Sequence, residues 1–139
     1  MASSKSVSQR YVLDALNRSM ASIEFALDGT IIDANQNFLD LTGYTIEEVR
    51  GKHHSIFVDE ASRNRQEYRD FWARLRAGEF QSGEFKRVTK TGETVAIQAT
   101  YNPVFDHRGT QLGVIKFAVD VTEKVLAREI GEAKQQRFT

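Results

Sequence analysis

Apolar and polar residues alternate with two different periods along the chain of 139 residues, and the two periods separate predicted strands from predicted helices. The segments 21–27 and 30–33 are apolar or alternating, and Asp28-Gly29 between them is typical of a two-residue hairpin turn. Three further strands are predicted at 81–89, 93–104 and 111–121, joined by the turn-like stretches KTGE and DHRG. The strands therefore fall into a leading pair and a trailing group.

Helical spacing marks the segments before, between and after these strands. The stretch SQRYVLDALNRSM predicts a short N-terminal helix. Asn35 is placed to cap a helix that ends at Gly43. Thr45, followed three residues later by Glu48, forms the capping-box pattern of another helix.

A longer amphipathic helix is predicted from Ala61 to Ala77, ended by Gly78, because large apolar residues recur there at intervals of three and four: Tyr68, Phe71, Trp72 and Leu75. A last helix begins at Thr122, and its near-heptad apolar spacing is typical of a helix that enters a coiled coil. Together the elements predict an α+β fold, with one antiparallel sheet and helices gathered on one face.

Composition narrows the classes of function. Lys+Arg and Asp+Glu are both 19, so the basic excess of a nucleic-acid-binding protein is missing. The chain has no cysteine, which excludes disulfides, a thiolate nucleophile, a cysteine-ligated zinc site and cysteinyl-flavin photochemistry. No apolar run is long enough to span a bilayer, and the start lacks the apolar stretch of a signal peptide. We therefore expect a cytoplasmic domain with no nucleic-acid partner and no direct membrane insertion.

Candidate chemistry gathers at the adjacent histidines His53 and His54 in the stretch GKHHSIF. Catalysis is not indicated. The pair Glu47-Glu48 consists of adjacent helical residues, which do not face each other. Ser55 lies beside His54 without an identifiable orienting group or oxyanion donor, and no glycine-rich phosphate loop follows a strand. We expect no enzymatic activity.

Three stretches, in family order, resemble a PAS domain: DGTIIDANQNFLDLTGYTIEEVRGK, FWARLRAGEFQSGEFKRVTKTGETVAIQATYNPVFDHRG and GVIKFAVDVTE. They are most similar to the PAS domains of methyl-accepting chemotaxis and aerotaxis-type receptors. The resemblance implies a five-stranded antiparallel sheet, with helices forming a pocket on one face and further helices flanking it. It divides the chain into an N-terminal helix or cap at 1–20, a PAS domain at 21–121 and a C-terminal signalling helix at 122–139.

The resemblance also implies a site around His54. Photosensory flavin domains carry a reactive cysteine at this position, whereas aerotaxis-type domains carry a histidine there and bind FAD noncovalently. Trp72 matches a tryptophan of that subgroup. Haem would need an imidazole ligand, which His53 or His54 offers, but haem-binding relatives usually carry theirs near the long helix, where this chain has none. The expected cofactor-binding residues are His53, His54, Trp72, Asn35, Phe38, Ile97 and Ala118.

Other positions weigh against a flavin. Ala96 stands where close relatives usually show a tryptophan, and Ile97 and Ala118 stand where photosensory domains place amides against the flavin ring. Three alternatives stay open, in order of preference: packing histidines with no tightly bound cofactor, FAD, and haem or another small ligand.

The function expected from the resemblance is that of a sensory domain of a chemoreceptor-type protein. It would act as a homodimer and relay its state through the C-terminal helix to a downstream module of the same parent chain. The alternatives are a ligand-free interaction module and a haem-based gas sensor.

Overall fold

The computed structural model describes residues 7–137, so the first six residues of the predicted cap and the last two of the predicted signalling helix lie outside the described residues. One antiparallel sheet has the strand order β2-β1-β5-β4-β3. Its strands are β1 (Ala21–Phe25), β2 (Ile31–Ala34), β3 (Gln81–Val88), β4 (Thr94–Phe105) and β5 (Gln111–Asp120). The expected five-stranded antiparallel sheet is confirmed, and β5 joins the leading pair to the trailing strands.

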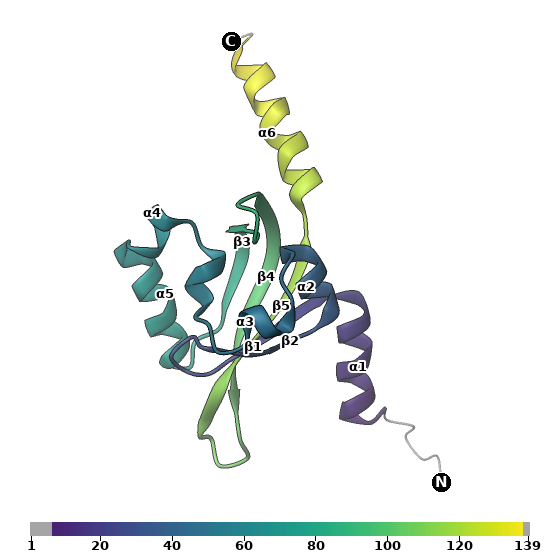
Figure 1. The fold of residues 1–139 in the computed structure, drawn as a ribbon, viewed down its shortest axis with the longest axis vertical. Coiled ribbons are helices and arrows are strands. Elements are labelled where there is room, and N and C mark those ends of the chain that lie inside the picture. Colours follow the sequence, from purple (N-terminus) through teal and green to yellow (C-terminus); the bar gives the residue numbers. More distant parts are fainter. Residues whose placement is uncertain (1–6, 138–139) are drawn as a thin grey trace.

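The helices that follow β2 and precede β3 gather on one face of the sheet, α1 lies to the side, and α6 projects beyond one end (Figure 1). Their bounds are α1 (Gln9–Ser19), α2 (Gln36–Thr42), α3 (Ile46–Val49), the 3-10 helix η1 (His54–Phe57), α4 (Glu60–Arg63), α5 (Gln66–Arg76) and α6 (Thr122–Arg137). Asn35 and Thr45 cap α2 and α3 as predicted, and Thr45 with Glu48 completes the capping box. Within residues 7–137 no helix has the length and apolarity needed to cross a membrane.

The prediction of one continuous helix from Ala61 to Ala77 is wrong, because the chain breaks between α4 and α5. Asp59 caps α4 by accepting a hydrogen bond from the Ser62 amide at 2.6 Å. Arg65 then takes an extended conformation, with φ −86° and ψ 155°, before α5 begins. The apolar stripe that suggested the helix lies wholly in α5, so it carried no information about the residues ahead of the break.

The two-residue turn predicted at Asp28-Gly29 is also wrong. The Ala26 amide donates to the Thr30 carbonyl at 2.8 Å, and the Gly29 amide donates to the Ala26 carbonyl at 2.9 Å, which makes a longer loop. Asp28 also accepts a hydrogen bond from the Thr30 amide, so its side chain stabilises this loop. The same two-bond pattern recurs in the other two hairpins, from Thr89 to Glu93 and from Asp106 to Thr110.

Each of these loops needs a glycine. Gly29, Gly92 and Gly109 have φ of 88°, 87° and 83°, the left-handed region that residues with a side chain rarely adopt. The shared loop geometry fixes where each hairpin resumes pairing. It therefore fixes which strand residues face the core.

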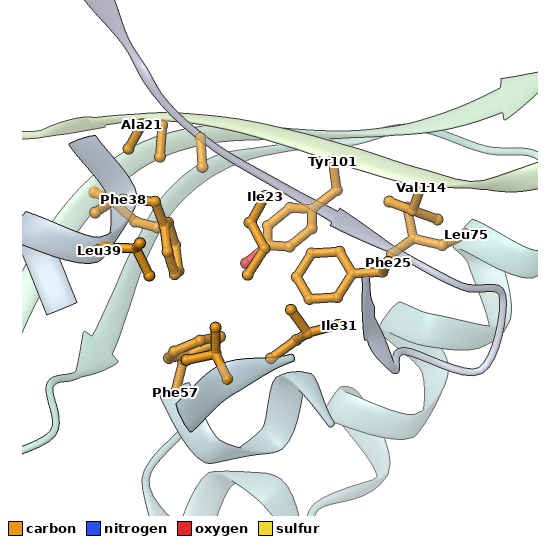
Figure 2. Packing of buried hydrophobic residues seen from close by; sticks show 14 of the residues in the cluster. Ala21, Ile23, Phe25, Ile31, Phe38, Leu39, Phe57, Leu75, Tyr101 and Val114 are labelled. Atoms are coloured by element: carbon orange, nitrogen blue, oxygen red, sulfur yellow. The ribbon is translucent and has the colours of Figure 1, made fainter. Parts of the chain in front are cut away.

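The core lies between the sheet and the covering helices. The rings of Phe25, Phe38, Phe57 and Tyr101 fill it together with aliphatic side chains (Figure 2), and none of the four is more than 2% exposed. Alternate residues of β4 and β5 point into this layer.

Candidate functional site

The structure separates the two adjacent histidines. His53 is the N-cap of η1, and it is exposed. Its Nδ1 accepts a hydrogen bond from the Ser55 amide at 3.0 Å, so its Nε2 carries the hydrogen and donates to the Asp28 carbonyl at 2.9 Å. His53 therefore ties the β1–β2 loop to η1. His54, the next residue, points inward and has no exposed surface.

Both ring nitrogens of His54 are hydrogen-bonded. Nδ1 lies 2.7 Å from the Tyr68 hydroxyl oxygen, and Nε2 lies 3.0 Å from the Tyr101 hydroxyl oxygen. The Trp72 indole donates to the Tyr68 oxygen at 3.2 Å. A neutral imidazole donates through one ring nitrogen and accepts through the other, so it can bond both hydroxyl groups. The result is a polar chain that runs Trp72, Tyr68, His54, Tyr101 from α5 through η1 to the middle of β4.

At the sheet end of this polar chain, Tyr101 meets two cations. Arg87 on β3 donates from Nε and Nη2 to the Tyr101 oxygen at 3.3 and 3.1 Å. Lys116 on β5 is 1% exposed, and its Nζ lies 4.8 Å from the centroid of the Tyr101 ring and 5.5 Å from that of Phe38. No carboxylate among the described residues forms an ion pair with Lys116. A buried amine thus relies on aromatic faces and one phenol oxygen.

The protonation of the site follows from this arrangement. Burial lowers the pKa of His54 well below its ordinary value, and the Arg87 and Lys116 charges act in the same direction. Burial also lowers the pKa of Lys116. Burial raises the pKa of Tyr101, but the two cations outweigh it and leave that pKa lowered, whereas burial raises the pKa of Tyr68 to about 12. The imidazole of His54 is therefore neutral. It lies between Tyr101, whose pKa is lowered, and Tyr68, whose pKa is raised.

The predicted site residues divide into two groups. His54, Trp72, Phe38, Ile97 and Ala118 all lie in the one core. The His54 ring meets that of Trp72 edge-on, at 5.5 Å between centroids.

His53 and Asn35 lie elsewhere. The Asn35 Oδ1 accepts from the Ser22 amide at 2.9 Å and from the Phe38 amide at 3.0 Å, and its Nδ2 donates to the Met20 carbonyl at 2.8 Å. These bonds use both ends of the amide group to join α2 to the α1–β1 connection. The contacts of Asn35 are structural, so its role in cofactor binding stays a prediction.

The core as its side chains stand fits neither an isoalloxazine nor haem. A haem ligand needs a free imidazole nitrogen, and both nitrogens of His54 are engaged. Aromatic rings surround His54 at centroid distances of 5.3 to 6.3 Å: Phe25, Phe57, Tyr68, Phe71, Trp72 and Tyr101. In the described part of the chain, every buried polar side-chain atom already has a hydrogen-bond partner. None is left to bond the polar edge of a flavin.

The sequence analysis did not identify Tyr68 and Tyr101 of the polar chain, nor the two cations at its sheet end, Arg87 and Lys116. Lys116 was detectable, because it occupies a core-facing position of period two between Val114 and Ala118, inside the apolar run GVIKFAVD. Tyr68 and Arg87 gave no such signal, since their partners come from distant parts of the chain.

Comparison with known proteins decides the family. A family model described as PAS domain matches residues 20–123. The chain belongs to the PAS domain family. This PAS domain is 50% identical over 107 residues to the biofilm dispersion protein BdlA of Pseudomonas aeruginosa, and the match covers 77% of the chain and 26% of that protein.

Two further relatives are more distant. The aerotaxis receptor of Escherichia coli is 28% identical, over 73% of the chain and 20% of the receptor. The bacterioopsin transcriptional activator of Halobacterium salinarum is 26% identical, over 76% of the chain and 16% of the activator. The PAS domain thus spans about a quarter or less of each of these relatives, which are named as signalling and regulatory proteins.

Solved structures confirm the fold. A PAS domain from Colwellia psychrerythraea has a TM-score of 0.70 at 19% identity, covering 82% of this chain and 97% of that one. An RNA-binding light-oxygen-voltage receptor has a TM-score of 0.74 at 21% identity, covering 98% of this chain and 40% of that one. A light-oxygen-voltage domain studied with a flavin analogue has a TM-score of 0.70 at 20% identity, covering 91% and 96%. At these identities the likeness concerns the fold alone.

Proposed function

We propose that this PAS sensory domain passes the state of its buried polar chain to α6 by a rearrangement of β4 and β5, with no flavin or haem in the core. The observation that carries the proposal is the continuity between the two parts. Tyr101 and Lys116 lie opposite each other on β4 and β5, and these same strands carry the junction with α6. A change in the Tyr101–Lys116 contact therefore acts on the strands that hold the helix.

The junction is a compact set of hydrogen bonds. The Thr122 hydroxyl donates to the Asp120 carboxylate at 2.5 Å and accepts from the Ala96 amide at 3.0 Å. The Val121 amide donates to the Ala96 carbonyl at 2.9 Å. Ala96 is next to the core residue Ile97, so a shift of β4 reaches the first turn of α6 directly.

Ion pairs continue the attachment along the helix. Arg128 donates to the Glu84 carboxylate of β3 from Nη2 and Nη1, at 2.7 and 3.1 Å, and Lys86 donates to the Glu129 carboxylate at 2.8 Å. Val125 is 3% exposed, whereas Leu126 and Ile130 remain 55% and 47% exposed. One side of α6 is held by the sheet, and the other offers apolar residues to another helix.

We further propose that the active form is a homodimer, and that α6 leads into a downstream module of the same parent chain. The exposed apolar residues Tyr11, Val12 and Leu13 of α1 support the first part, because a second copy would cover them. The second part is supported by the much greater length of the relatives. Since their names are those of signalling proteins, we propose no catalytic role.

The relay is tested with Tyr101→Phe, which removes the hydroxyl that His54, Arg87 and Lys116 share. Amide hydrogen exchange in α6 should accelerate by about fivefold, which corresponds to a decrease of about 1 kcal/mol in the free energy of local opening of this helix. Tyr44→Phe is the matched control, because Tyr44 packs against Phe57 and lies outside the polar chain. Unchanged exchange in Tyr101→Phe, or an equal change in Tyr44→Phe, would show that α6 does not respond to the core.

The dimer is tested with Val12→Glu, which places a charge on the exposed apolar part of α1. Sedimentation equilibrium should show weaker association than in the wild type, and Gln9→Glu on the same helix should associate normally. Association that is unaffected by Val12→Glu removes α1 from the interface.

An absorption spectrum of freshly purified protein tests the cofactor-free core, and a flavin or Soret band would contradict it.

A further inference from the structure

A cleft of about 470 Å³ opens between α5 and the segment that runs from His53 to Asn64. Three arginines line it: Arg63, Arg69 and Arg76. His53, Tyr68 and Trp72 contribute aromatic rings to the same wall. The volume lies within the range of small-molecule sites in proteins.

The charge of this arginine cleft is uncompensated. None of the residues that line it is acidic, and none of its three arginines forms an ion pair within residues 7–137. The whole chain has a formal net charge of zero, so the cluster does not reflect a generally basic composition. The carboxylate of Asp59 feels the Arg63 charge, but it is hydrogen-bonded to the Ser62 amide.

The guanidinium groups are held in place only in part. Arg63 donates from Nη2 to the Val58 carbonyl at 2.9 Å. Arg69 donates from Nε and Nη2 to the Gln66 side chain at 3.2 and 3.0 Å and from Nη1 to the Asn64 carbonyl. These partners are neutral, so they position the two side chains without cancelling their charge. Arg76 has no recorded hydrogen-bond partner in the described structure.

We infer that the arginine cleft binds a small, multiply charged anion, either a polycarboxylate or a phosphate compound. Guanidinium groups bind both kinds of oxyanion through paired hydrogen bonds. The two nitrogens of His53 are already engaged, so this residue supplies a ring face and the arginines supply the charge.

The cleft also touches the start of the buried polar chain. Tyr68 and Trp72 line it, and the Tyr68 hydroxyl is bonded to His54. A bound anion would therefore act on the chain that leads to Tyr101. This coupling rests on the proposed function, whereas anion binding does not.

Trp72 is the only tryptophan of the chain and lines the arginine cleft, so all tryptophan fluorescence comes from a residue of this wall. The intact protein is titrated with citrate and, separately, with inorganic pyrophosphate, at constant ionic strength. We expect a saturable fluorescence change with a Kd of about 1 mM or tighter for at least one probe. Saturation by citrate alone identifies the carboxylate source, and saturation by pyrophosphate alone identifies the phosphate source.

Variants locate the binding. Arg69→Gln and Arg76→Gln should each weaken it by about tenfold or more, the loss of charge-assisted hydrogen bonds. Arg74→Gln is the matched control, because Arg74 lies on the same helix outside the cleft lining. An absence of saturation with both probes overturns the inference, and so does an equal loss in Arg74→Gln. Saturation by a poly-glutamate peptide and by neither probe overturns it in favour of an acidic protein partner.

The same samples keep the two proposals apart. If a probe binds and hydrogen exchange in α6 does not change, the cleft is a binding site and only the relay fails. If no probe binds and Tyr101→Phe still alters α6, the relay stands and the cleft inference fails.

Discussion

Replacing His54 should change how the stability of the domain depends on pH. In the unfolded chain an unperturbed histidine has a pKa of about 6.5. In the folded domain burial and two nearby cations keep the pKa of His54 well below its ordinary value. Below the unfolded pKa, the unfolded state therefore binds a proton at this residue that the folded state does not. The free energy of unfolding falls as the pH is lowered through this window.

The size of the effect follows from proton linkage. Each pH unit below the unfolded pKa removes up to about 1.4 kcal/mol. As long as folded His54 stays neutral, the loss between about pH 7 and about pH 5 is about 2 kcal/mol. His54→Gln lacks this titration, so its free energy of unfolding should fall by about 2 kcal/mol less over the same interval.

Urea denaturation at both pH values, followed by circular dichroism, measures the two differences. A pH dependence of His54→Gln equal to that of the wild type would refute the reasoning. If the variant does not fold, the ring resonances of His54 in the wild type give the answer by nuclear magnetic resonance. They should stay those of a neutral imidazole until the domain unfolds, and titration at the ordinary histidine pKa would be the contrary result.

Four other substitutions test three separate parts of the structure by chemical or thermal unfolding. Tyr68→Phe should cost about 1 to 3 kcal/mol, because it leaves Nδ1 of buried His54 without its hydrogen-bond partner; a loss no larger than that of Tyr44→Phe would contradict this. Lys116→Met should be neutral within about 1 kcal/mol or stabilising, since it replaces a buried amine without a carboxylate partner by an apolar side chain of similar length; a loss above about 3 kcal/mol would show that the amine is required. Gly29→Ala and Gly92→Ala should each cost about 1 kcal/mol or more for the left-handed backbone. Gly29→Ala should cost more, because the new Cβ would lie 2.5 Å from Nε2 of His53 whereas the space at Gly92 is open, and equal losses would contradict that contact.

The sheet could be predicted from the sequence because each strand carries its own signal. The alternation of residues along β4 places Ile97, Ala99 and Tyr101 on one face whatever their neighbours are, and the structure buries all three. The break before α5 was not visible, because it depends on how Asp59 begins the short α4 and how the chain extends at Arg65 before α5. A one-residue uncertainty of that kind also left open which histidine faces inward.

The two clusters of functional interest depend on long-range contacts. Arg69 and Arg76 are seven residues apart on one helix, so a shared face could be expected, but Arg63 precedes the break and joins them only in three dimensions. The polar chain and the two cations at its sheet end draw on η1, α5, β3, β4 and β5. No local pattern joins these elements, apart from the single charged residue in the apolar run of β5.

The position of β5 in the sheet has a consequence for how the domain is made. Phe25 of β1 pairs with Val114 of β5, so the two halves of the sheet meet only through a segment near the end of the PAS domain. During synthesis, β1 cannot pair with β5 until β5 has left the ribosome, so β1 and β2 remain separate from the rest of the sheet until then. Closing so long a loop is slow, because its entropy is lost before the contacts form. The helix that follows β5 emerges after the sheet strands, and it extends from a sheet that has only just closed.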